Sequence, residues 1–148
     1  MKTGYKVCDA MTKKPIMVLP TTSIIECAKI MSANHVGSLL ISEEKKILGL
    51  ITEQDIVRKA VAQHNNLHKS KVEDHMEKRL HTIGPEVDIF DAIKMMGEHN
   101  IRHLPVMDDE EMLGFVTLKD ILKIQPELFE LMVDKIELRE IENKPVDL

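Results

Sequence analysis

Two short stretches decide how this chain folds: "GLITEQD", Gly49–Asp55, and "GFVTLKD", Gly114–Asp120. Both follow the pattern Gly-apolar-apolar-Thr-x-x-Asp, and the second lies 65 residues after the first. At that same spacing Val7 aligns with Val72, and the match continues without a gap as far as Val57 and Leu122. Two copies are too few for a solenoid, which needs three or more repeats to bury a continuous core. The repeat therefore predicts two similar halves with pseudo-twofold symmetry.

Each half shows the same succession of sequence patterns. "PIMVLP" and "HTIGP" predict a short first strand, and residues 23–34 and 88–100 carry apolar residues at helical spacing. "SLLIS" and "HLPVM" are each followed by an acidic turn and a second apolar run, which predicts a strand hairpin. We therefore predict an α/β fold made of two pseudo-symmetric β-α-β-β-α repeats packed through their sheets.

The domain boundaries follow from composition. We place the repeats at residues 7–62 and 72–124, joined by a polar linker at 63–71, "QHNNLHKSK". A C-terminal helix is predicted at 126–142, because apolar residues recur there with helical spacing within an acidic segment. We expect this helix to pack on the repeats or on a partner.

Composition excludes several classes of protein. The 148 residues are 43% apolar and 30% charged, which is typical of one globular chain. Three Phe, one Tyr and no Trp leave few aromatic faces for stacking on nucleic-acid bases, so a nucleic-acid partner is disfavoured. Apolar runs are too short to span a membrane, and two cysteines make no disulfide framework. We expect a cytoplasmic protein without membrane association.

The twin Thr-x-x-Asp motif has two interpretations. Thr52 with Asp55, and Thr117 with Asp120, fit capping boxes, in which two side chains satisfy free N–H groups at a helix start. Alternatively, each Asp could accept the hydroxyl groups of a ribose, with the Thr hydroxyl and the helix start facing a phosphate. On the second interpretation, the preceding glycine lets the strand backbone approach the ligand closely.

Several quoted stretches together resemble a known family. "DAMT", "DHM", "IRHLPVMD" and "GLITEQDIVRK", in order and at one spacing, resemble a tandem pair of CBS domains, the Bateman module, from Val7 to about Ile124. The resemblance implies a stand-alone regulatory protein whose two clefts between the halves bind AMP, ADP, ATP or S-adenosylmethionine. It also implies a homodimer that transmits ligand occupancy to an unknown regulated protein, without catalysis.

The resemblance assigns residues to each cleft. In the main cleft, Thr117 and Asp120 match the hydroxyl-bearing residue and the ribose-binding acid, and Arg102 and His103 match the phosphate contacts. The adenine wall of that cleft matches Thr12, Ile16, Val36 and Gly37. The residues that match in the second cleft are Thr52, Asp55, Ser38, His81 and Ile101. Glu77 stands where the first half has Thr12 and disfavours an anionic ligand in the second cleft.

The sequence gives little support for a metal site or for catalysis. His64 with His68, and His99 with His103, are four residues apart, but no further ligand completes a zinc set, so we predict no metal site. No phosphate loop, paired-acid hydrolase pattern or nucleophile elbow is present. The alternative from another class is a ligand-independent scaffold that dimerises and holds a partner.

Overall fold

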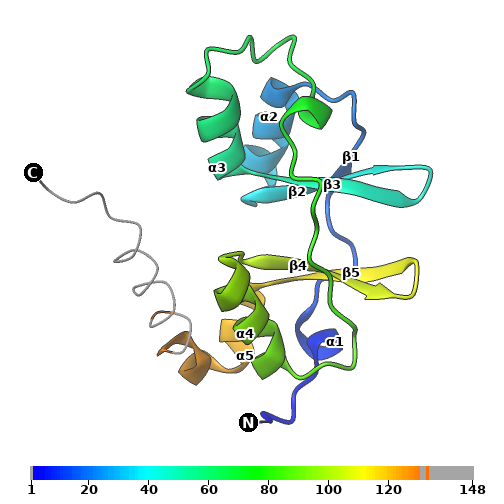
Figure 1. Ribbon diagram of the computed structural model, residues 1–148, viewed down its shortest axis with the longest axis vertical. Coiled ribbons are helices and arrows are strands. Elements are labelled where there is room, and N and C mark those ends of the chain that lie inside the picture. The colour runs from blue at the N-terminus through cyan, green and yellow to red at the C-terminus, as the bar shows by residue number, and fades with distance from the viewer. Residues whose placement is uncertain (1, 131–132, 134–148) are drawn as a thin grey trace, which may run out of the picture. The chain divides into compact units, whose positions relative to one another are not determined.

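A computed structural model describes residues 2–130 and 133 of the chain. It divides into two compact units, which are described separately. Unit 2 is residues Pro15–Leu80, and unit 1 combines Met1–Lys14 with the chain from His81 onward. Both units mix strands with helices, as the repeat predicts, so the α/β fold class is confirmed (Figure 1). Most of the C-terminal helix expected at 126–142 lies outside the described residues.

Unit 2 is a three-stranded sheet with helices. Its strands run in the order β1-β2-β3, with β1 parallel to β2 and β2 antiparallel to β3. The elements of this unit are β1 (Met17–Val18), α2 (Ile24–Asn34), β2 (Ser38–Glu43), β3 (Lys46–Thr52), α3 (Glu53–Asp55), the π-helical η1 (Ile56–Val61) and the 3-10 turn η2 (Val72–Asp74).

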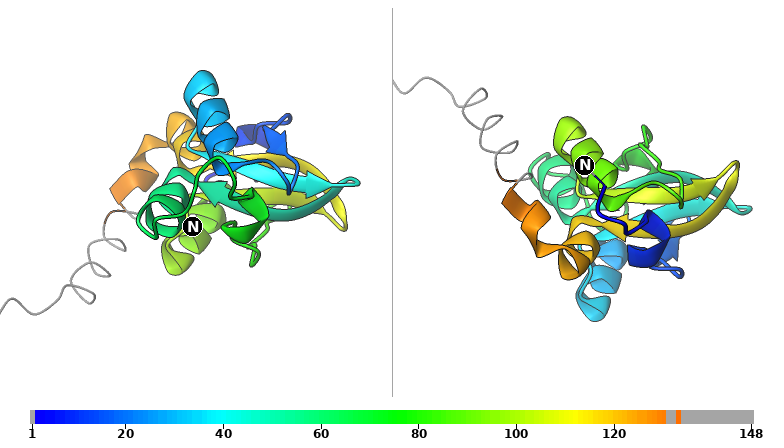
Figure 2. Two further views of the ribbon diagram at one scale, coloured as in Figure 1. Left: turned by 90° about the horizontal axis from the view of Figure 1, so that it is seen from above. Right: turned by 90° about the horizontal axis from the view of Figure 1, so that it is seen from below.

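Unit 1 repeats this plan with a shorter first strand. The antiparallel hairpin β4–β5 matches β2–β3 in register, with its turn on the side away from the helices of the unit (Figure 2). The elements of this unit are α1 (Val7–Ala10), α4 (Ile89–His99), β4 (His103–Asp108), β5 (Glu111–Thr117), α5 (Leu118–Ile124) and the 3-10 turn η3 (Pro126–Leu128).

The strand expected at "HTIGP" is reduced to a single parallel bridge between Ile83 and Val106. The Ile83 amide donates to Pro105, and the Met107 amide donates back to Ile83, at 3.1 and 2.9 Å. In unit 2 the Leu40 amide donates to Ile16 at 3.1 Å and extends the ladder by one residue. The aligned residue of unit 1 is Pro105, which has no N–H, so only the bridge at Ile83 remains.

The segment before each repeat's first strand packs on the other repeat. Val7 is completely buried in a core built from α4, β4, β5 and α5, and its amide donates to Val87 at 2.8 Å. Val72 is likewise buried in the core of unit 2 and donates to Thr22 at 2.8 Å. The sequence repeats at 7–62 and 72–124 are therefore not the compact units. Each compact unit takes its first segment from the other sequence repeat.

An N-terminal strap fixes this exchange in unit 1. Asp88 caps α4 by accepting from the Phe90 amide at 2.9 Å. The same carboxylate accepts from the Thr3 amide and hydroxyl and from the Gly4 amide. Desolvation acts to raise the pKa of Asp88, but these hydrogen bonds outweigh it and hold the pKa below its usual range.

Candidate functional site

The twin motif forms capping boxes in both units. The Thr117 hydroxyl accepts from the Asp120 amide at 3.2 Å, and Asp120 Oδ2 accepts from the Thr117 amide at 3.0 Å. Thr52 and Asp55 make the same pair of bonds at 3.1 and 3.0 Å. The capping interpretation is confirmed. It leaves the other oxygen of Asp120 without a protein partner among the described residues, and so able to accept another hydrogen bond.

Five residues assigned to the main cleft meet on unit 1. The Leu118 amide donates to the Arg102 carbonyl at 2.8 Å, which holds Arg102 at the start of α5. His103 is the register partner of Thr117 across the hairpin. Thr12 exchanges two hydrogen bonds with Phe115, at 2.8 and 2.9 Å. The five residues of unit 1 are Thr12, Arg102, His103, Thr117 and Asp120.

This surface of unit 1 offers groups of several chemical kinds. The Arg102 side chain is exposed, whereas Thr117 and Asp120 are half-buried on the capped turn. The His103 ring is tilted against Phe115 with centroids 6.0 Å apart. A guanidinium can fork onto phosphate oxygens, and a carboxylate oxygen can accept from hydroxyl groups. The surface therefore carries a cation, a hydroxyl group and an acceptor within one turn of α5.

The matched surface of unit 2 has no residue equivalent to Arg102 and carries an additional acid, Glu53. The Glu53 amide donates to the Gly37 carbonyl at 3.0 Å, so this pair takes the place of Leu118 and Arg102. The Glu53 carboxylate lies so close that a Cβ on Gly37 would be 3.0 Å from Oε1. Ser38 is the register partner of Thr52, as His103 is of Thr117. An acid thus stands near the capped turn where unit 1 has a base.

The motif glycines do not have the expected role. A Cβ on Gly114 would lie 2.7 Å from Met11 Sδ and 2.8 Å from the Thr12 oxygen. On Gly49 it would lie 2.6 Å from Met76 Sδ and 2.9 Å from the Glu77 oxygen. The space beside each glycine is filled by the chain itself, so the expectation that it serves a ligand is wrong. Because each glycine has no side chain, the segment from the other repeat can pack directly against it.

The remaining expected residues are divided between the units. Ile16, Val36 and Gly37 of the main-cleft set belong to unit 2. His81 and Ile101 of the second set belong to unit 1, where His81 stacks on His99 with centroids 3.8 Å apart. Each unit therefore carries part of each expected set.

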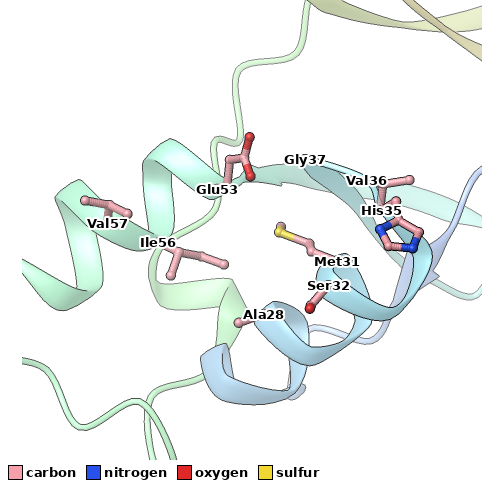
Figure 3. Close-up of a pocket in the computed structure, with 9 residues that line it drawn as sticks. All are labelled: Ala28, Met31, Ser32, His35, Val36, Gly37, Glu53, Ile56 and Val57. Carbon is pink, nitrogen blue, oxygen red and sulfur yellow. The ribbon is translucent and has the colours of Figure 1, made fainter.

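A pocket that the sequence patterns did not indicate opens on unit 2, with a volume of about 540 Å³. Met31 and Ile56 point into it from α2 and η1, with Glu53 and His35 at its edge (Figure 3). Val36 and Gly37 line the pocket, but Thr52 and Asp55 do not. Its lining carries no Lys or Arg, so it is poorly suited to a phosphate.

Within residues 2–130 and 133, no group of three or more His, Cys, Asp or Glu side chains could hold a metal ion. No helix described there is both long and apolar enough to cross a membrane.

Comparison with known sequences gives a family match. A family model described as CBS domain matches residues 7–62 and 72–127. CBS domain-containing protein YhcV of Bacillus subtilis is 31% identical over 115 residues, covering 78% of this chain and 81% of the relative. Mitochondrial CBS domain-containing protein CBSX3 of Arabidopsis thaliana is 33% identical over 106 residues. That match covers 68% of this chain and 52% of the relative, so this chain spans about half of that protein. It likewise covers 57% of an uncharacterised Methanopyrus kandleri relative.

Comparison with solved structures agrees. The CBS domain pair of protein MJ0100, solved in complex with 5′-methylthioadenosine and S-adenosyl-L-methionine, has a TM-score of 0.73 and 33% identity. The match covers 81% of this chain and 94% of that one. An uncharacterised conserved protein from Pyrococcus horikoshii has a TM-score of 0.77 and 28% identity, with coverages of 84% and 94%.

Proposed function

Since this chain belongs to the CBS-domain family, with two copies of the domain, we propose that it is a regulatory module that binds adenosine-containing ligands. The observation that carries the proposal is the gathering of Arg102, Thr117 and Asp120 on unit 1. A domain pair with 33% identity was solved with two such ligands, which supports the same ligand class here.

The proposed roles follow the chemistry of each group. The Asp120 oxygen that is not used in capping accepts from the ribose hydroxyl groups. Arg102 and His103 contact a phosphate, or the charged tail of another adenosine compound, where a charge-assisted hydrogen bond contributes about 1.5–3 kcal/mol. We propose that Thr12 of unit 1 forms part of the adenine wall.

A second site is proposed on the first repeat. It uses Thr52, Asp55 and Ser38 of unit 2. Because Glu53 lies near this capped turn and Glu77 matches Thr12, an anionic ligand binds there less tightly than at Asp120.

The output is proposed to be regulation rather than catalysis. Ligand occupancy is transmitted to a second protein, and the module acts as a cytoplasmic homodimer. The ligand candidates are AMP, ADP, ATP and S-adenosylmethionine. All four contain adenosine, and Asp120 binds its ribose.

The test is a thermal-shift screen with these four ligands and with GMP as a control. Binding to the folded state alone stabilises it by about 2.7 kcal/mol at a ligand concentration one hundred times Kd. We expect an upward shift of the melting temperature with at least one adenosine compound and a smaller one with GMP. If no adenosine compound shifts the transition, the ligand-independent scaffold is the better account.

A further inference from the structure

The two capped turns differ in one contact that the repeat alignment does not anticipate. Lys59 Nζ lies 3.2 Å from Asp55 Oδ1, in an ion pair four residues along the chain. Oδ2 of the same carboxylate accepts from the Thr52 amide at 3.0 Å. Both oxygens of Asp55 are therefore engaged by the protein.

The second repeat has no equivalent of this lysine. The residue that aligns with Lys59 is Ile124, which carries no charge. Asp120 Oδ2 accepts from the Thr117 amide, and no described cation pairs with Asp120. Two carboxylates that cap their helices in the same way thus differ in whether one oxygen is free to accept a ligand hydroxyl group.

The Lys59 ion pair is well placed to persist. The acid precedes the base by four residues, which is the favoured order on a helix. The Asp55 side chain is only 18% exposed, and the lysine side chain is 43% exposed. The lysine thus covers an already half-buried carboxylate.

We propose that Lys59 is a specificity-determining residue that masks the ribose acceptor of the first repeat. A ligand at Asp55 must displace the ammonium group from Oδ1 before its hydroxyl groups can bind. A ligand at Asp120 meets no such competitor among the residues that the structure describes. The site on the second repeat therefore fills first. This inference rests on the proposed function, because it assumes that both carboxylates accept ribose.

The size of the effect follows from the strength of such pairs. Helical and partly exposed ion pairs contribute about 0.2–1 kcal/mol, which corresponds to roughly a 1.5- to 5-fold change in affinity. Replacing Lys59 by the aligned isoleucine should therefore tighten binding at Asp55 by about two- to fivefold. Adenosine is the suitable probe, because it has no phosphate that the lysine could attract.

The experiment is an NMR titration of the whole chain with adenosine. The Thr52 and Thr117 amides, each bonded to its own aspartate, report the two sites separately in one sample. In the wild type, we expect the Thr117 amide to respond at lower adenosine concentration. In Lys59→Ile, affinity read at Thr52 should rise two- to fivefold, while affinity read at Thr117 stays the same.

Arg58→Gln is the matched control, because it removes an exposed base from the position just before Lys59 on the same helix. It should leave both affinities unchanged. The inference is overturned if Lys59→Ile does not tighten binding at Thr52, if both amides gain equally, or if Arg58→Gln has the same effect. If neither amide of the wild type responds to adenosine or AMP, the proposed function itself fails, and this inference fails with it.

Discussion

Gly114→Ala should destabilise the protein even though it adds one methyl group. The new Cβ would lie 2.8 Å from the Thr12 carbonyl oxygen, which belongs to the backbone and cannot rotate away. Met11 Sδ, at 2.7 Å, could move because it is part of a flexible side chain. The Thr12 segment must therefore shift away from β5.

The cost can be worked from these contacts. Thr12 and Phe115 exchange two hydrogen bonds, at 2.8 and 2.9 Å, and each such bond contributes about 0.5–1.5 kcal/mol. Overpacking a core costs about 1–3 kcal/mol, and alanine returns about 0.4–1 kcal/mol by restricting the unfolded chain. We expect a net loss of about 1–3 kcal/mol.

The assay is urea unfolding followed by circular dichroism, read as a shift of the midpoint at constant slope. Gly84→Ala is the matched control, because a Cβ there would meet only Val87 Cγ2, at an ordinary 3.7 Å. We expect Gly84→Ala to stay within about 0.5 kcal/mol of the wild type or to be slightly more stable. If Gly114→Ala is equally stable, the packing account of the motif glycine is wrong.

Three further predictions follow from buried or hydrogen-bonded groups. Val7→Ala should lower the free energy of unfolding by about 2 kcal/mol, because Val7 is buried in the core of unit 1. It should also lower hydrogen-exchange protection in α4 more than in α2, and equal losses in the two helices would contradict the segment exchange. Because the pKa of Asp88 is lowered, its carboxylate stabilises the fold above the ordinary pKa of about 3.9, and this stabilisation is lost as pH falls below that value. The difference in unfolding free energy between wild type and Asp88→Asn should therefore shrink over that range, and a constant difference would refute this. Burial raises the pKa of the Cys27 thiol to about 11, so a thiol reagent at pH 8 should modify the half-buried Cys8 first, and equal rates would contradict it.

Much of the fold could be predicted because most of its elements are indicated twice, once in each copy of the repeat. The helices Ile24–Asn34 and Ile89–His99, the two hairpins and the two capping boxes lie where the patterns placed them. The exchanged first segments could not be read from periodicity. Val7 and Val72 are apolar in either arrangement, and only tertiary contacts decide which core each one enters. The same contacts give Gly49 and Gly114 their role.

The residue types of the candidate site could be predicted from the sequence, but the contacts that each residue makes could not. The motif places Thr117 and Asp120, and the family resemblance assigns Arg102. The structure shows that the Arg102 carbonyl accepts from the Leu118 amide at the start of α5. The ion pair between Lys59 and Asp55 was missed, although four-residue spacing of acid and base on a helix could have indicated it.

The central claim is that Asp120 binds a ligand as well as capping α5. The most direct test is calorimetric titration of the wild type, Asp120→Ala and Asp120→Asn with AMP and with S-adenosylmethionine, alongside their unfolding free energies. Asn can keep an oxygen for the Thr117 amide but loses the carboxylate charge, so it separates the two roles. We predict that Asp120→Ala loses about 1 kcal/mol of stability and at least about tenfold in affinity, and that Asp120→Asn loses affinity with a smaller loss of stability. Unchanged affinity in both variants, with stability alone reduced, would contradict the account and leave Asp120 as a helix cap only.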